Sequence, residues 1–423
     1  MNSTTPSHPA PALMNIRFWL KFSLFNLCIV ALLGVLMRYK IGFEFPYLSQ
    51  KYLQYAHSHF AFAGWISHSI YVLIVYFMLH KVQNSSYAPY RRLLIANMVC
   101  AYGMLFSFSF QGYSLLSIVF SSGTIVIACV FTYFLNRDFK GLSADAPGRN
   151  WFIAALWFNI LSSAGTVYLA YIMATHHFNE NWYLAAVYFY LHFQYNGFFV
   201  FSCMGLTVQA ASRFLPEYRY NPLLFRLFFV SVIPAYFLST LWAKLPLWLY
   251  CIVVVAAFIQ VLAWFLFVRD VRRALPAKVD LPMLGKYLLL FVAIAFSVKL
   301  FLQLGSTIPL LSKLAFGFRP VVIAYLHLIL LAVISVFLLT YMYSAGLLRQ
   351  GKTAVLALTT FVVGVFLNEL VLAVQGVASF SYTPLSSVNV LLFLIALILF
   401  AGSALLWYSQ RKPYHPEEEN RLL

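Results

Sequence analysis

The stretch HSHFAFAGWISH (residues 57–68) places three histidines, His57, His59 and His68, in a run that is otherwise as apolar as a membrane helix. Only ten histidines occur in the 423 residues of the chain. An ionisable side chain within a membrane helix has to face a protein interior, a cavity or a cofactor, because lipid excludes it. The stretch therefore indicates a membrane protein with a histidine-containing interior.

The composition of the chain supports this interpretation. Hydrophobic residues make up 63% of the chain and charged residues 9%, whereas soluble proteins carry about 25% charged residues. The net charge of +17 fits the Lys/Arg excess of cytoplasmic loops in membrane proteins, so we do not expect nucleic-acid binding. The five cysteines lie in apolar runs without a CxxC or CxxCH pattern, which argues against disulfides and covalently attached haem.

Runs of about 20 mostly apolar residues, the length that a transmembrane helix needs, divide the chain. They lie at 17–37, 56–80, 91–110, 112–135, 151–174, 182–209, 223–243, 246–268, 282–304, 319–343, 354–378 and 384–408. We therefore predict an all-α integral membrane protein of about twelve transmembrane helices. It forms a single membrane domain over residues 17–410, between an N-terminal tail, 1–16, and a charged C-terminal tail, 411–423.

The basic residues predict the orientation of the helices. Most of them lie in the connections that follow even-numbered helices, as Arg91, Arg92, Arg272 and Arg273 do. Basic loops favour the cytoplasmic side, so both termini are expected in the cytoplasm and the lipid bilayer is the expected surrounding. We expect the bacterial cytoplasmic (inner) membrane as the location.

Three histidines from distant helices are predicted at one depth. The second, sixth and tenth helices begin on the outer side, and His57, His192 and His327 follow those starts by about one to ten residues, or at most about 15 Å of helix rise. Histidines that converge in this way suit a metal centre or a haem, which takes an axial ligand on each face. The alternative is that each histidine only hydrogen-bonds a neighbouring helix.

The second helix also offers room beside its histidines. Helical steps of 100° place His57, Ala61, Gly64 and His68 on one stripe, with His59 nearly opposite. The two small residues leave space for a flat ring, although small residues also simply allow helices to pack closely.

The sixth helix carries YFYLHFQYNGFF (residues 188–199). In it Tyr188, His192 and Asn196 share a face, and Tyr195 lies within one turn of the histidine. Tyrosine can supply a proton and histidine can supply a ligand. The alternative is a polar contact between helices.

Three segments resemble subunit I of the haem–copper oxidase superfamily, which includes cytochrome oxidases and nitric-oxide reductases. They are AHSHFAFAGW (56–65), LHFQYNG (191–197) and YLHLILL (325–331). The resemblance implies that His57, followed by Gly64 and Trp65, ligates a low-spin haem, with His59 as the alternative. On the tenth helix the family has H-x-H, so His327 matches the second low-spin ligand and Tyr325 stands in place of the high-spin ligand.

The resemblance is incomplete at the copper site. His192 and Tyr195 match a copper ligand and the tyrosine that follows it, which gives them the expected catalytic role. The family supplies two adjacent histidines from the seventh helix, whereas residues 223–243 contain none. Copper normally takes several nitrogen or sulfur ligands, so we do not expect a complete copper centre.

The function implied by the resemblance is that of a haem oxidoreductase in respiratory electron transport. It would transfer electrons and reduce O2 or NO, with an electron donor or other membrane subunits as partners. Two alternatives stay open: a non-catalytic haem sensor or assembly subunit of the same fold, and a twelve-helix secondary transporter.

Two charges fall inside apolar helices, Lys299 and Glu369. Burying an unpaired charge costs several kcal/mol, so the simplest prediction is that the two residues pair. The functional alternatives are that Lys299 binds a haem propionate or that the two residues relay protons.

Overall fold

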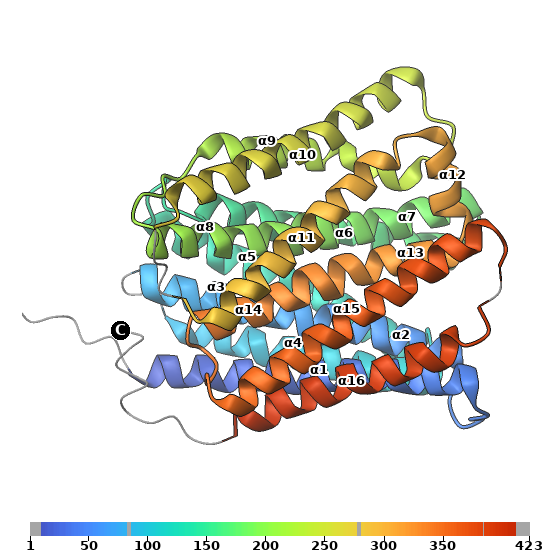
Figure 1. Ribbon diagram of the computed structural model, residues 1–423, viewed down its shortest axis with the longest axis horizontal. Coiled ribbons are helices and arrows are strands. Elements are labelled where there is room, and N and C mark those ends of the chain that lie inside the picture. Colours follow the sequence, from blue (N-terminus) through green and yellow to red (C-terminus); the bar gives the residue numbers. More distant parts are fainter. Residues whose placement is uncertain (1–9, 83–85, 277–280, 384, 412–423) are drawn as a thin grey trace, which may run out of the picture.

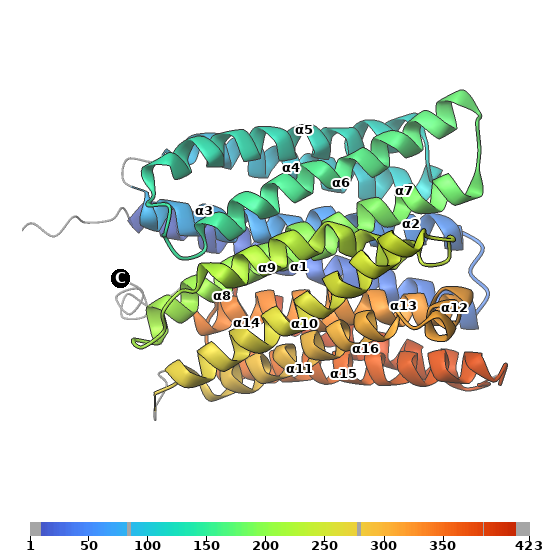
Figure 2. The same ribbon diagram turned by 90° about the horizontal axis from the view of Figure 1, so that it is seen from above.

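The computed structural model describes residues 10–82, 86–276, 281–383 and 385–411. The helices run roughly parallel or antiparallel to one another in a single bundle (Figures 1 and 2). Residues 1–9 of the predicted N-terminal tail and residues 412–423 of the predicted C-terminal tail lie outside the described part. Residues 10–16, which we assigned to the tail, belong to the first helix.

Helical segments account for all of the regular structure in the described part of the chain. The first half contains α1 (Ala10–Gly42), α2 (Gln50–Phe60), η1 (Ala61–Ser67), α3 (His68–Lys81), α4 (Tyr87–Gln111), α5 (Leu115–Asp138), η2 (Phe139–Gly141), α6 (Arg149–Thr175), α7 (Glu180–His192), η3 (Phe193–Phe199) and α8 (Val200–Phe214). The second half contains α9 (Pro222–Val232), η4 (Pro234–Thr240), α10 (Leu247–Ala274), α11 (Met283–Gly305), α12 (Pro309–Gly317), α13 (Arg319–His327), η5 (Leu328–Ser335), α14 (Val336–Ser344), α15 (Lys352–Phe380) and α16 (Val388–Ser409).

The predicted fold class is confirmed. Ten helices among the described residues are long and apolar enough to cross a membrane, and the pair α9 and η4, bent by 41°, makes eleven if it counts as one span. The remaining predicted segment, 182–209, corresponds to α7, η3 and α8, which together run beside α6 (Figure 2). Each of the twelve predicted helices therefore has a helical counterpart.

The seventh predicted helix, 223–243, is not regular. Its α-helical part ends at Val232, and Pro234 begins the 3₁₀ segment η4. Proline has no N–H group and its ring clashes with the preceding turn, so it interrupts an α-helix. The short helix α12, which lies between α11 and α13, was not predicted.

Three spans contain a π-helical turn, and each turn follows a candidate histidine. The turn η1 begins four residues after His57, while η3 and η5 begin directly after His192 and His327. Such turns are rare and occur often at functional sites. The prediction that residues 57–68 form one regular α-helical stripe is wrong, because the step of 100° per residue does not hold through η1.

Polar side chains support the π-helical turn η1. Asn26 Nδ2 on α1 donates to the Gly64 carbonyl at 2.7 Å, and Asn97 Nδ2 on α4 donates to the Ala63 carbonyl at 3.2 Å. Tyr102 OH in turn donates to Asn26 Oδ1 at 2.8 Å. Backbone polar groups in a membrane need partners within the protein, so α1 and α4 fix the helix that carries His57.

Candidate functional site

Two contacts hold the second and tenth spans side by side. Trp65 Nε1 on η1 donates to Ser335 Oγ on η5 at 2.9 Å. Towards the other end, the Arg319 guanidinium at the start of α13 donates to Gln54 Oε1 on α2 at 3.2 Å. The segment of α2 that carries His57 therefore faces the segment of α13 that carries His327.

His57 and His327 have matching hydrogen bonds. Nδ1 of His57 lies 3.1 Å from the Val30 carbonyl on α1, and Nδ1 of His327 lies 2.9 Å from the Ile323 carbonyl. Neither Nε2 has a hydrogen-bond partner among the described residues. A histidine that ligates a metal characteristically donates its other ring N–H to a carbonyl or carboxylate, which orients the ring. Both side chains are only half-buried.

The two histidines are also electrostatic neighbours. His57 lies close enough to interact with His327, and the Arg38 guanidinium on α1 interacts with both. Arg38 was not among the predicted site residues. Its position at the outer end of the first apolar run, against the predominant distribution of basic residues, was the signal for a site residue. Arginine binds carboxylates through charge-assisted, often bidentate hydrogen bonds.

His59 faces away from this pair, as the helical geometry predicted. Its Nε2 lies 3.1 Å from Tyr113 OH, and its ring stacks on Phe108 with centroids 4.3 Å apart. Gly64 lies against Phe60, since a Cβ built on it would be 2.7 Å from that ring. Ala61 is half-buried.

His68 is fully buried, and its ring meets the edge of Trp19 with centroids 5.4 Å apart. Neither of its ring nitrogens has a hydrogen-bond partner among the described residues. Since η1 separates His68 from His57, the two histidines do not lie on one α-helical stripe.

A second polar network surrounds His192. Its Nε2 donates to the Val232 carbonyl at 2.8 Å, and its Nδ1 accepts from Asn196 Nδ2 at 3.1 Å. Asn196 Oδ1 accepts from Lys299 Nζ at 2.6 Å, and Lys299 Nζ also donates to Gln303 Oε1 at 2.5 Å. These bonds connect the end of α7, the turn η3, the last residue of α9 and the helix α11. The side chains that form them are at least nine-tenths buried.

The predicted pair of Lys299 and Glu369 is wrong. Lys299 Nζ binds the two amide oxygens described above, and no ion pair among the described residues joins it to Glu369. The Glu369 carboxylate instead accepts from Asn368 Nδ2 at 3.2 Å. Lys299 is therefore part of the His192 network.

Tyr195 connects this network with the tenth span. Its ring lies against that of Tyr325 at an angle of 71°, with centroids 6.4 Å apart. It also contacts the Ser239 side chain on η4. Tyr325 stands two residues before His327, so Tyr195 lies against the span that carries His327.

The donor sets differ in what they can hold. His57 and His327 offer two oriented imidazoles from opposite helices, which fits a haem with two axial ligands, and Arg38 fits a haem carboxylate. His192 has both ring nitrogens in hydrogen bonds, and the described residues contain no group of three or more His, Cys, Asp or Glu side chains that could hold a metal ion. This set does not fit copper, which needs several such ligands.

Metal analysis of the purified protein tests this difference. We expect clearly less than one copper per chain, because ligation by His192 would have to displace its bond to Val232 or to Asn196. About one copper per chain, lost in the His192→Ala variant, would contradict this prediction and would place a copper centre at this network.

Comparison with known proteins bears on the fold. No protein-family model matches the sequence, and no curated protein sequence matches it. Among solved structures, the chain is similar to a haem–copper terminal oxidase that was determined as a dimer by cryo-electron microscopy. The TM-score is 0.71 and the identity 12%, over 95% of this chain and 85% of that chain. The chain is thus an all-helical membrane protein with the fold of a haem–copper oxidase, as the three sequence segments predicted.

Proposed function

We propose that the protein is a membrane haem protein that transfers electrons, with a low-spin haem between His57 and His327. The observation that carries the proposal is that each histidine directs Nδ1 to a backbone carbonyl and leaves Nε2 without a partner among the described residues. Bound there, the haem would supply a one-electron carrier. Arg38 would bind one of its carboxylates, and the bonds to Val30 and Ile323 would orient the two imidazoles.

Reduction of a small gas molecule, O2 or NO, is the second candidate function. The contact of Tyr195 with Tyr325 supports it, because it brings Tyr195, three residues after His192, against the span that carries His327. The hydrogen bonds that occupy both nitrogens of His192 favour instead a haem protein that transfers electrons or senses ligands without this reaction.

The orientation and location of the protein are part of the proposal. Basic residues such as Arg92 and Arg273 lie at the end of the bundle near which both described termini lie, which supports cytoplasmic termini. We propose the bacterial cytoplasmic membrane, a single membrane domain from the start of α1 at Ala10 to the end of α16 at Ser409, and an electron donor or further membrane subunits as partners.

An optical spectrum of the purified protein tests the proposed function. Reduced-minus-oxidised bands of a low-spin haem are expected, without a shift on adding carbon monoxide if both axial positions are filled by histidine. A shift would reveal an open iron position and would favour gas reduction. A protein purified without haem bands, and unable to take up added haem, would contradict the proposal and favour the transporter.

Gly34 is expected to control the position of His57. A Cβ built on Gly34 would lie 3.7 Å from His57 Cε1, which is an ordinary contact. Gly34→Ala should therefore keep the haem, whereas Gly34→Leu should push the imidazole away and lower the haem content several-fold. Haem content per protein measures the effect. Gly42→Leu, on the same helix with nothing within 4 Å of its Cβ, is the control, and equal loss in both leucine variants would contradict the prediction.

A further inference from the structure

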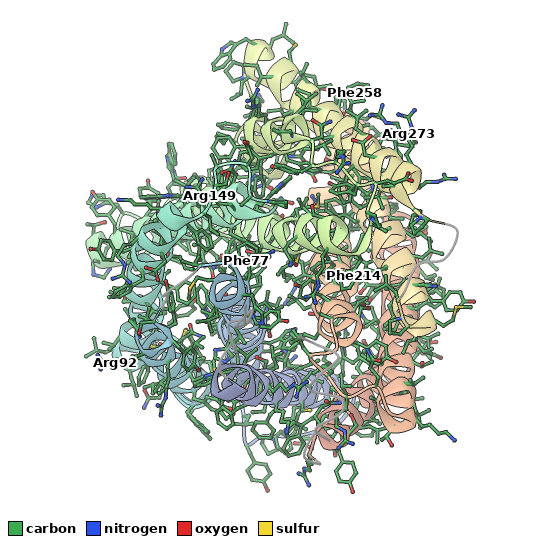
Figure 3. The ribbon with its side chains drawn as sticks, turned by 90° about the vertical axis from the view of Figure 1, so that its left-hand side faces the viewer. Phe77, Arg92, Arg149, Phe214, Phe258 and Arg273 are labelled. Carbon is green, nitrogen blue, oxygen red and sulfur yellow. The ribbon has the colours of Figure 1, made fainter. Side chains whose placement is uncertain are left out.

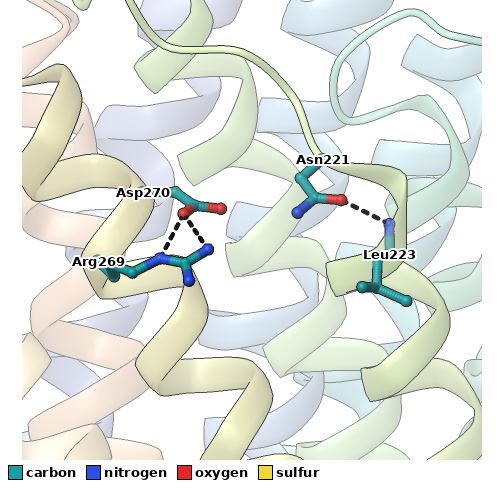
Figure 4. Close-up of polar contacts among 4 residues, drawn as sticks. All are labelled: Asn221, Leu223, Arg269 and Asp270. Atoms are coloured by element: carbon teal, nitrogen blue, oxygen red, sulfur yellow. Dashed lines mark hydrogen bonds and ion pairs between the residues drawn. The ribbon is translucent and has the colours of Figure 1, made fainter.

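A charged groove lies at the end of the bundle towards which α10 runs. It has a volume of about 570 Å³ and lies between the connection from α8 to α9 and the last turns of α10. Its lining includes Arg219 and Glu217 from the connection, and Arg269, Asp270 and Arg273 from α10. Figure 4 shows the two walls, with Asn221 on one and Arg269 on the other.

The groove lies at the depth of lipid headgroups. With 28 residues and a rise of 1.5 Å per residue, α10 is about 42 Å long, whereas the hydrocarbon core of a bilayer is about 30 Å thick. The charged residues occupy only the last turns of this helix. Its preceding residues are apolar, so Arg269 and Arg273 emerge where the hydrocarbon ends.

The charge of the groove is positive. The Arg269 Nε and a terminal nitrogen both donate to Asp270 Oδ1, at 3.0 and 2.8 Å, so these two charges offset each other. Arg219 and Arg273 remain, against Glu217 alone. The buried Tyr218 stands beside Asp270, and burial together with this carboxylate raises the pKa of its hydroxyl. Tyr218 therefore stays neutral and adds no negative charge.

The N-terminal end of α9 supplies no negative charge that would neutralise Arg219 and Arg273. Asn221 Oδ1 accepts from the Leu223 backbone N–H at 3.0 Å and caps the helix (Figure 4). The first turn of α9 contains no acidic residue. An anion in the groove therefore meets two guanidiniums, and among the lining residues Glu217 supplies the one carboxylate besides the paired Asp270.

An exposed apolar stripe leads from the bilayer to the groove. Phe258, Leu262 and Phe265 are 59%, 43% and 68% exposed, and they precede Arg269 at spacings of four, three and four residues. These spacings place all four side chains on one face of α10. Figure 3 shows Phe258 and Arg273 on the same side of the molecule. A molecule that fills both regions needs an anionic head and an apolar chain.

We propose that this groove binds the headgroup of an anionic phospholipid, with an acyl chain along the stripe of Phe258, Leu262 and Phe265. Guanidiniums bind phosphate through charge-assisted hydrogen bonds. Arg219 and Arg273 come from different elements, so a phosphate between them would tie the connection from α8 to α9 to the end of α10. The site is independent of haem binding, because none of these residues belongs to the His57 or His192 sites.

Native mass spectrometry of the full-length protein, released from detergent and titrated with phosphatidylglycerol, tests the proposal. Each basic residue near a membrane surface contributes a factor of about five in affinity for an anionic lipid. The Arg219→Gln/Arg273→Gln variant should therefore bind phosphatidylglycerol at least about tenfold more weakly. Phosphatidylcholine should bind the wild type and the variant alike.

Arg92→Gln is the matched control. Arg92 is an exposed arginine at the same end of the molecule but on the far side from Arg273 (Figure 3), so its loss should leave phosphatidylglycerol binding unchanged. An equal effect of Arg92→Gln and the double variant would show general surface charge and overturn the proposal. So would unchanged binding by the double variant.

The apolar stripe has a separate test. Phe265→Asn should weaken the binding of phosphatidylglycerol. It should leave unchanged the binding of glycerophosphoglycerol, the same headgroup without acyl chains, as measured by its competition with the lipid. If inorganic phosphate competes as strongly as the whole lipid does, the groove is a site for free anions. That result would overturn the assignment to lipid.

Discussion

Replacing His57 by alanine is expected to abolish the low-spin haem spectrum of the purified protein. The variant lacks one of the two neighbouring imidazoles carried by α2 and α13, and neither of the other two histidines in residues 57–68 can take its place. His59 is held against Phe108 and Tyr113, and His68 lies beyond the turn η1. His327→Ala should have the same effect. The spectrum and the haem content per protein measure both losses.

His59→Ala is the matched control, since it removes a histidine two residues away on the same helix. It should keep the spectrum. A spectrum that survives in His57→Ala and is lost in His59→Ala would show that the axial ligand is His59, and a spectrum that survives in both would show that the haem, if present, binds elsewhere.

Loss of the spectrum has to be separated from loss of the fold. His57→Gly leaves space for a free imidazole beside Gly34, so adding imidazole should restore a low-spin spectrum in a folded variant. Failure of this rescue, together with aggregation of the variant in detergent, would indicate that His57 supports the fold instead of the iron.

The positions of the membrane spans along the sequence could be predicted from hydropathy. Runs of about 20 apolar residues have few structural options in a bilayer, because a spanning helix satisfies all of its own backbone hydrogen bonds. Hence even the sixth helix, with its polar residues near His192, was predicted between 182 and 209 and is helical from 180 to 214. The break at Pro234 has a local cause and could have been read from the sequence.

The π-helical turns could not be predicted. The turn η1 contains Gly64 and η3 contains Gly197, but η5 reads LILLAVIS and carries no such residue. What stabilises η1 comes from other helices, since Asn26 and Asn97 bind its carbonyls. Tertiary partners of this kind leave no periodic signal in the segment itself.

The partners of the buried charges could not be predicted from the sequence either. Opposite charge suggested that Lys299 and Glu369 pair, whereas Lys299 binds the amides of Asn196 and Gln303. Of these, Gln303 lies four residues away on the same helix and was within reach of a sequence argument. Asn196 lies 103 residues away, and only the packing of η3 against α11 brings it close.

Asn196→Leu is expected to destabilise the protein by about 3 kcal/mol or more. The substitution removes an acceptor from Lys299 and the donor to His192 Nδ1 at once, deep in the bundle. Leaving a buried donor or acceptor without its partner costs about 1–3 kcal/mol, and more for a charged group, and here both Lys299 and His192 lose a partner, although Lys299 keeps its bond to Gln303. Thermal unfolding in detergent measures the change, and a melting temperature equal to that of the wild type would contradict the prediction.

The double variant Asn196→Leu/Lys299→Met separates this network from a simple packing effect. Replacing both partners of a buried polar contact by apolar side chains is often nearly neutral, whereas replacing one leaves the other unsatisfied. We therefore expect the double variant to recover part of the stability that Asn196→Leu loses, because the buried ammonium is gone, while His192 Nδ1 and Gln303 Oε1 still lack the partners that Asn196 and Lys299 supplied. Lys286→Met, an exposed lysine on the same helix α11, should by itself change stability by less than about 0.5 kcal/mol and should recover nothing in combination with Asn196→Leu. Equal stability of Asn196→Leu and the Asn196→Leu/Lys299→Met variant would mean that the leucine clashes at position 196 and that the bond to Lys299 contributes little.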